Sequence, residues 1–145
     1  MIGQVKADAD SANETTGDWR LQPVFGLHIG TPQKVSASVG IGRDRPSKRG
    51  AFKGYFVLVE PGLAGGKISS GIYELGPYGT GFAGRISLLR TWEDPWGIES
   101  NRTLIGVEGQ VFGFALSPRV GVFYRTTGPK SEELWYVTGS FGFLF

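Results

Sequence analysis

Bulky apolar side chains at alternate positions in the stretch WYVTGSFGFLF, at residues 135–145, limit the folds available to this chain more than any other feature. Alternate side chains of a β-strand face opposite sides of the sheet. One face of such a strand carries the large apolar residues Trp135, Val137, Phe141, Phe143 and Phe145. The other face carries mostly small and polar residues. The apolar face requires a second layer to cover it, which is protein in a soluble fold and lipid in a membrane-spanning one.

The same two-residue period recurs from Trp19 onward, and Gly or Pro interrupts it about every ten to fifteen residues. The pattern predicts about eight antiparallel strands, at residues 20–31, 34–43, 52–62, 66–75, 80–92, 102–115, 118–126 and 133–145. Turn-forming residues connect the strands in succession, among them TPQ at 31–33, PGLAGG, GPYG at 76–79 and the SP of ALSP. Successive hairpins without crossover helices predict a meander. We therefore predict an all-β fold, an eight-stranded antiparallel up-and-down β-barrel over residues 19–145.

Residues 1–18 are polar, so we predict a flexible N-terminal tail or linker there. The tail does not have the apolar core of a signal peptide. An outer-membrane protein needs such a leader, so either the leader has been removed, as we expect, or the protein stays in the cytosol. No run of about 18 apolar residues occurs that could form a transmembrane helix.

The predicted strands have two contrasting faces. Before the C-terminal strand, the apolar face carries Phe25, Leu27, Ile29, Val35, Ala37, Val39, Ile41, Tyr55, Val57, Val59, Phe82, Ile86, Leu88, Ile105, Val107, Val111, Val120 and Val122. The polar face carries His28, Ser36, Ser38, Gly40, Glu60, Ser69, Arg85, Ser87, Glu108, Gln110, Arg119 and Thr138, with Leu58, Phe112 and Phe123 among them.

The polar face is small and sparsely charged, unlike the Lys-, Glu- and Thr-rich exterior of a soluble barrel. Small residues suit the crowded interior of an eight-stranded barrel. Enclosed charges must be paired, because each is costly to desolvate alone. We therefore predict an ion-pair core in the lumen, formed by Glu60, Arg85, Glu108 and Arg119 with His28. The predicted barrel has an apolar exterior and a polar interior, as transmembrane barrels have.

The aromatic residues provide an independent indication. Odd and even strands of an up-and-down barrel run in opposite directions, so their ends alternate between two rims. Trp92, Trp96, Tyr124 and Trp135 then fall at one rim, and Trp19, Tyr78, Phe143 and Phe145 fall at the other. Two aromatic girdles of this kind lie at the membrane interfaces of transmembrane barrels.

The composition excludes several kinds of site. The chain has no Cys, which excludes disulfides, thiolate metal sites and Cys nucleophiles. Its single histidine, His28, excludes a multi-histidine metal site, and we expect neither a metal nor a cofactor. The net charge is only +2, so a nucleic-acid surface is not indicated.

The basic residues are concentrated in RDRPSKRG at residues 43–50, which contains Arg43, Arg45, Lys48 and Arg49. This stretch could contact phosphate-bearing lipid head groups or an acidic partner. The alternative is a solvated loop.

With these features the chain resembles the small eight-stranded outer-membrane β-barrels of Gram-negative bacteria, the OmpA, OmpX and OmpW type. The resemblance is one of pattern over residues 19–145, and VTGSFGFLF at the C-terminus is its most specific part. It implies that the barrel-assembly machinery reads Val137, Phe141, Phe143 and Phe145, and that the protein is a monomer in contact with outer-membrane lipid. Two features depart from the family: the loops of the predicted outer rim are short, and RDRPSKRG falls on the predicted periplasmic side.

Three functions follow as alternatives. The first is a non-enzymatic outer-membrane barrel with a structural, adhesive or interaction role in the bacterial envelope. The second is a soluble, lipocalin-like barrel that binds a small apolar ligand, which requires the apolar face to turn inward. The third is a lipid-modifying enzyme, because some of the resembled barrels are lipid A acylases or deacylases and His28 faces Ser36 or Ser38 on the next strand. The local motifs of those enzymes are absent, and a lone lumenal histidine is more often a hydrogen-bonded core residue.

Overall fold

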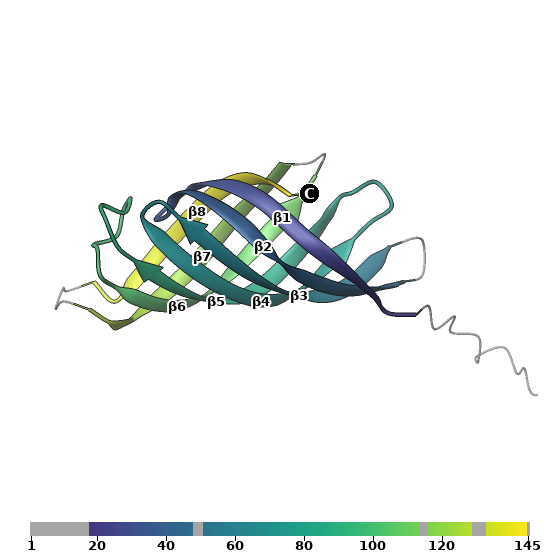
Figure 1. The fold of residues 1–145 in the computed structure, drawn as a ribbon, viewed down its shortest axis with the longest axis horizontal. Helices are drawn as coiled ribbons and strands as arrows, with labels where there is room; N and C mark the ends of the chain where they lie inside the picture. Colours follow the sequence, from purple (N-terminus) through teal and green to yellow (C-terminus); the bar gives the residue numbers. More distant parts are fainter. Residues whose placement is uncertain (1–17, 48–50, 114–115, 129–132, 145) are drawn as a thin grey trace, which may run out of the picture.

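The structure is a computed structural model that describes residues 18–47, 51–113, 116–128 and 133–144. These residues form strands and connecting turns, and no helix occurs among them. The strands are β1 (Arg20–Gly30), β2 (Lys34–Pro46), β3 (Phe52–Gly62), β4 (Gly65–Leu75), β5 (Gly81–Thr91), β6 (Thr103–Phe112), β7 (Leu116–Thr127) and β8 (Trp135–Leu144) (Figure 1). The predicted tail at residues 1–18 lies outside the described residues, apart from Asp18.

Each strand pairs antiparallel with the next one along the chain, and β1 pairs with β8 to close the barrel. The predicted all-β fold and its eight-stranded antiparallel barrel are thereby confirmed. The turn predicted at Ser117 and Pro118 is wrong, because both residues lie within β7. The chain reverses earlier, where Gly113 and Leu116 exchange backbone hydrogen bonds of 3.0 and 2.9 Å.

The connections lie at two opposite ends of the barrel (Figure 1). The end where β1 begins and β8 ends, here called the terminal rim, also holds the β2–β3, β4–β5 and β6–β7 connections. The opposite end, the distal rim, holds the turns at 31–33 and 63–64, the loop at 92–102 and the β7–β8 connection. The basic stretch at 43–50 was predicted as a connection, but Arg43–Pro46 belong to β2. The stretch leads toward the β2–β3 connection at the terminal rim.

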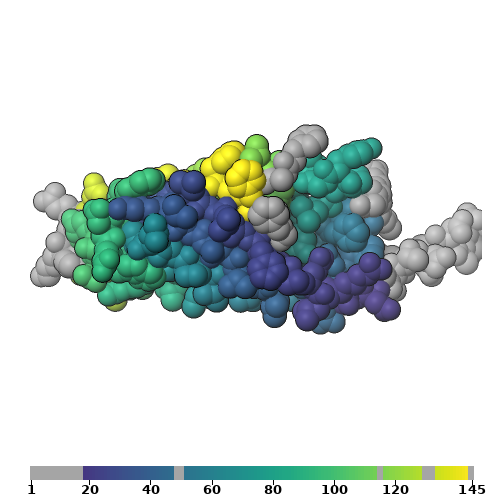
Figure 2. Space-filling view, turned by 45° about the horizontal axis from the view of Figure 1, so that its top comes forward, coloured from purple at the N-terminus to yellow at the C-terminus, as the bar shows by residue number. Residues whose placement is uncertain are grey.

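The first strand extends beyond the last one at the terminal rim. Gly26–Gly30 pairs with Ser140–Leu144, whereas Arg20–Phe25 pairs with β2 alone among the described residues. Figure 2 shows the start of β1, in purple, lying beyond the C-terminal residues, in yellow. This stagger follows from the strand tilt that closing a barrel requires.

The two faces of each strand follow the alternation in the sequence. Large apolar side chains are exposed on the exterior of every strand, including Ile72 on β4, Val107 on β6 and Val137 on β8, which are 68%, 61% and 74% exposed. The predicted polar face is turned inward, where Glu60, Ser69 and Ser87 are almost completely buried. The exterior of the barrel is therefore apolar, and its lumen contains the charges.

The lumen is layered along the barrel axis, and β5 passes through each layer in turn. From the terminal rim, its inward side chains are Ala83, Arg85, Ser87 and Leu89. Ala83 belongs to an apolar cluster near the terminal rim with Phe56 and Leu58. Leu89 belongs to a second apolar cluster near the distal rim, formed with Ile98, Leu104, Phe123 and Tyr136. Arg85 and Ser87 lie between these two clusters.

Candidate functional site

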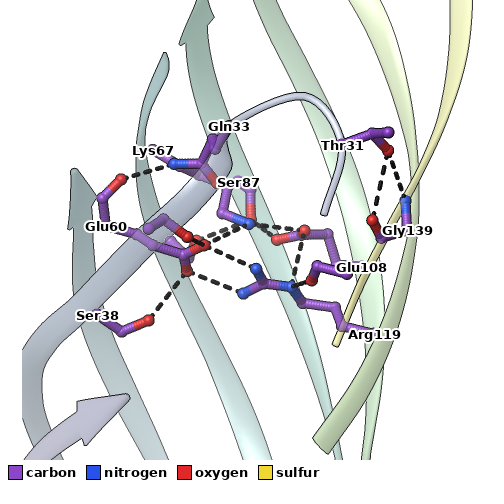
Figure 3. A network of polar contacts seen from close by, with 12 residues as sticks. Thr31, Gln33, Ser38, Glu60, Lys67, Ser87, Glu108, Arg119 and Gly139 are labelled. Carbon is purple, nitrogen blue, oxygen red and sulfur yellow. Dashed lines mark hydrogen bonds and ion pairs between the residues drawn. The ribbon is translucent and has the colours of Figure 1, made fainter. Parts of the chain in front are cut away.

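Glu60 on β3 is the centre of a network of charged groups inside the barrel (Figure 3). Arg119 on β7 reaches across the lumen and donates to both carboxylate oxygens, from Nη1 to Oε2 at 2.8 Å and from Nη2 to Oε1 at 2.7 Å. Ser36 and Ser38 on β2 donate to the same carboxylate at 3.1 and 3.2 Å. The ion pair between Arg119 and Glu60 is bidentate and buried, which is the strong form of an Arg–carboxylate contact.

Glu108 on β6 is the second carboxylate of the network. It accepts hydrogen bonds from Lys67 Nζ at 2.8 Å and from Ser87 Oγ at 2.6 Å. Lys67 Nζ also lies 3.4 Å from Glu60 Oε1, and Arg119 Nε lies 3.5 Å from Glu108 Oε1. Two carboxylates and two cations therefore alternate in one cluster, so that each buried charge has an opposite charge beside it. Glu60, Lys67, Glu108 and Arg119 are called the ion cluster below.

The ion cluster differs from the predicted core in three residues, one gained and two absent. Lys67 belongs to it, and Arg85 does not. Arg85 is buried in the lumen as predicted, and it is the register partner of Glu108, yet no described carboxylate lies within ion-pair distance of it. The reason is that Lys67 and Arg119 already occupy the carboxylate oxygens. Lys67 was discernible from the sequence, because it shares the inward phase of Ser69.

His28 is buried between β1 and β8, outside the ion cluster. Neither of its ring nitrogens has a hydrogen-bond partner among the described residues. It pairs in register with Ser36, but the Ser36 and Ser38 hydroxyls donate to Glu60. The described residues therefore contain no Ser–His hydrogen bond. Gly142, opposite His28 on β8, leaves room for the ring, because a Cβ there would lie 2.2 Å from His28 Nδ1.

The loop at 92–102 folds over the distal rim and is held there by several contacts. Trp92 Nε1 donates to the carbonyl of Leu63 at 3.0 Å, and the Trp96 backbone N–H donates to the carbonyl of Pro32 at 3.1 Å. The Lys34 ammonium donates to Asp94 Oδ2 at 2.8 Å, and this contact holds the pKa of the Asp94 carboxyl below its ordinary value. With Ile98 packed into the distal apolar cluster, the loop closes this end of the lumen.

Exposed aromatic residues lie near both rims. Four of them lie toward the distal rim, Trp92, Trp96, Tyr124 and Trp135. The ring centroids of Tyr124 and Trp135 are 5.1 Å apart. Trp19 and Tyr78 lie at the terminal rim. The guanidinium groups of Arg43 and Arg45 each lie 5.4 Å from the Trp19 ring. Lys48 and Arg49, the other predicted head-group contacts, lie outside the described residues.

The alternate apolar residues of β8 point outward. Val137, Phe141 and Phe143 are 74%, 49% and 47% exposed, and Phe145 lies outside the described residues. Their inward neighbours Tyr136 and Thr138 are buried.

A second polar group at the terminal rim was not predicted. Asp44 on β2 is buried there and accepts hydrogen bonds from the Gln22 amide and, at 3.2 Å, from the Tyr73 hydroxyl. Beside it, a cavity of about 180 Å³ extends into the lumen as far as Arg85. The sequence carried a signal for Asp44, which shares the inward phase of Ser36 and Ser38, but none for the cavity.

No group of three or more His, Cys, Asp or Glu side chains within the described ranges is arranged to hold a metal ion. None of the described segments forms a helix long and apolar enough to cross a membrane. Comparisons with protein-family models, with curated proteins and with solved structures found no match to this chain.

Proposed function

We propose that this chain is a bacterial outer-membrane β-barrel without enzymatic activity, which serves a structural, adhesive or interaction role in the envelope. The observation that carries the proposal is the inverted burial of the barrel. Side chains such as Ile86, Val107 and Val122 are exposed in the middle of their strands, whereas Glu60 and Arg119 are buried inside. A closed barrel of this kind needs an apolar medium around it.

The extent of the exposed apolar surface supports this proposal over a soluble barrel. The largest apolar patch on a typical soluble monomer covers about 300–600 Å² and is often functional. Here exposed Val, Ile, Leu and Phe side chains occur on all eight strands, so the apolar surface surrounds the barrel. A lipocalin-like function requires these side chains to line the lumen, and they lie on the opposite face.

The rims support the same proposal. Trp92, Trp96 and Trp135 toward the distal rim and Trp19 at the terminal rim suit the polar–apolar boundary of a bilayer. Arg43 and Arg45 beside Trp19 supply cations at the level where lipid phosphates lie. We expect the C-terminal strand to be read by the barrel-assembly machinery, as the resemblance implies.

The filled lumen supports a role that depends on the outer surface and the loops. The ion cluster and the distal apolar cluster occupy the interior. Ser36 and Ser38, the hydroxyls nearest to His28 in register, are engaged by Glu60, which argues against their activation by His28 as nucleophiles.

Heat-modifiability tests the proposal. The purified chain is refolded into detergent micelles and into phospholipid vesicles, then run on SDS gels with and without boiling. We expect a compact species that shifts on boiling, together with resistance of the strands to protease in vesicles. A chain that folds as a monomer in plain buffer, and whose migration does not change on boiling, would contradict it.

A further inference from the structure

We infer that the lumen at the terminal rim binds an alkyl carboxylate, a single-chain amphiphile. Its carboxylate head would lie at Arg85, and its hydrocarbon chain would fill the cavity between Arg85 and the terminal rim. This inference goes beyond the proposed structural role. It concerns the interior of the barrel, so it does not depend on what surrounds the exterior.

The cavity has the lining that a hydrocarbon chain requires. It is lined by Gln22, Pro23, Val24, Phe56, Leu58, Tyr73, Leu75, Arg85 and Phe112. Most of these side chains are apolar, and they come from β1, β3, β4, β5 and β6. The volume of about 180 Å³ exceeds the roughly 150 Å³ of an apolar cavity that stays dry and binds benzene. The cavity is therefore large enough for a short alkyl chain.

Arg85 places a cation at the inner end of this apolar cavity. It is only 5% exposed, and its Nε and Nη1 have no hydrogen-bond partner among the described residues. Its guanidinium lies 5.0 Å from the centroid of the Phe56 ring, a cation–π contact that supplies no acceptor for Nε and Nη1. A buried guanidinium without a counter-ion is costly, whereas one that donates to a carboxylate makes a strong, directional contact.

No carboxylate of the described residues is positioned to serve Arg85. Glu60 and Glu108 are held by Lys67 and Arg119. Asp44, at the mouth of the lumen, accepts hydrogen bonds from Gln22 and Tyr73 at Oδ2. Its Oδ1 has no partner among the described residues, and Asp44 does not line the cavity that Arg85 lines. A counter-ion for the Arg85 guanidinium must therefore come from outside the described part of the chain.

Gln110 is a second unpartnered polar side chain, one register step nearer the terminal rim than Arg85. It lies on β6, next to β5, and both amide atoms lack partners among the described residues. Register pairs Gln110 with Ala83 and Glu108 with Arg85, so Gln110 is a diagonal neighbour of Arg85 on the same inward face. The amide N–H of Gln110 and the guanidinium of Arg85 are both donors, and a carboxylate has two oxygens to accept from them. An alcohol or an alkane carries no negative charge to pair with Arg85.

The stagger of the barrel leaves an approach to the cavity at the terminal rim. The β1 segment Arg20–Phe25 extends past β8 and pairs with β2 alone among the described residues. Pro23, which lines the cavity, lies in this segment, which is paired on one side only, as an edge strand that tolerates proline is. None of the lining residues comes from β7 or β8 within the described ranges.

Photo-crosslinking tests this inference. The folded full chain, in nanodiscs of zwitterionic phospholipid, is irradiated with an octanoic acid analogue that carries a mid-chain diazirine, or with the matching octanol analogue. Modified residues are located by mass spectrometry.

Neighbouring residues of β3 distinguish a probe in the lumen from a probe in the surrounding lipid. Phe56 and Leu58 point inward, while Val57 and Val59 point outward. If the inference holds, the carboxylate probe labels Phe56 and Leu58 about tenfold more than the alcohol does, since a hydrogen bond to a charged group has that effect.

Two variants on the same strand give the matched comparison. Arg85→Met should reduce inward labelling by the carboxylate probe about tenfold. Arg90→Met should not change it, because Arg90 is an exposed cation that donates to Thr103 Oγ1. Leu58→Trp, which fills the cavity and keeps Arg85, should abolish inward labelling at Phe56.

The opposite results would overturn the inference. These are labelling of Val57 and Val59 alone, equal inward labelling by the acid and the alcohol, or inward labelling that Arg85→Met leaves unchanged. If Arg85→Met does not fold, the comparison of acid with alcohol and the Leu58→Trp variant decide. The heat-modifiability assay tests the outer-membrane proposal independently of the ligand site. If the chain shows no gel shift but is labelled at its inward residues, the ligand site stands and the outer-membrane proposal fails.

Discussion

Glu60 is the residue on which the interior of this barrel depends most. Its carboxylate is completely buried and accepts four hydrogen bonds, two from Arg119 and one each from Ser36 and Ser38. Desolvating such a charge costs several kcal/mol, and only close partners offset that cost. If one carboxylate is removed, Lys67 and Arg119 remain buried with a single acid between them.

Glu60→Gln should therefore lower the free energy of unfolding by about 3–5 kcal/mol, as measured by urea unfolding of the barrel in lipid vesicles. Glu74→Gln on β4 is the control, because Glu74 forms a partly exposed ion pair with Lys53 at 3.1 Å that contributes at most about 1 kcal/mol. The double variant Glu60→Gln, Arg119→Met should recover part of the loss. Equal effects of Glu60→Gln and Glu74→Gln would refute the central role of Glu60.

At the level of the strands, the alternation of apolar and polar residues determines which medium the barrel tolerates. The middle of β6 illustrates this, because Val107 points outward between Ile86 on β5 and Val122 on β7, while Glu108 points inward. The strands are 10 to 13 residues long, close to the roughly 9–11 residues that a tilted strand needs to span a bilayer core. A charge placed on the outer face would therefore be penalised according to its depth.

Val107→Arg should destabilise the barrel in phospholipid vesicles by about 2–4 kcal/mol, because it places a cation near the centre of the bilayer. Leu63→Arg, at the exposed turn of the distal rim, should change stability by about 0–1 kcal/mol. Both values are measured by urea titration against the unsubstituted chain. In a soluble barrel both positions would be ordinary surface sites, so changes of less than about 0.5 kcal/mol at each would count against the membrane proposal.

In the molecule as a whole, the lumen is closed by successive layers. The loop at 92–102 and the distal apolar cluster cover one end, and the ion cluster blocks the middle. The cavity at the terminal rim ends at Arg85 and does not continue to the distal rim. Small eight-stranded barrels have room for side chains and leave no continuous aqueous path.

The folded barrel should consequently conduct no ions. We expect no stepwise currents when it is inserted into planar phospholipid bilayers, with insertion verified by recovery of the heat-modifiable species from the same membranes. Discrete, reproducible current steps from this species would contradict the closed lumen described here.

Much of this architecture follows from the order of residues along the chain. The two-residue period from Phe25 to Phe143 predicts the strands, their number and the side chains that share a face, because alternation is a local property of extended backbone. Lys67 follows from the same rule, through its phase with Ser69, although it was not among the predicted lumen residues. The ends of β6 and β7 were predicted less well, since Ser117 and Pro118 have turn chemistry but the close approach of Gly113 and Leu116 makes the reversal.

Contacts across the lumen arise from closure of the barrel. Whether Glu60 meets Arg119 or Arg85 depends on the stagger accumulated around eight strands and on the barrel diameter, and neither is encoded in a local pattern. The same closure leaves Arg85 without a carboxylate within ion-pair distance, brings Ile98 over the distal end and opens the cavity beside the start of β1, which β8 does not reach. The alternation of residues thus determines which side chains face inward, and the three-dimensional register determines which of them meet.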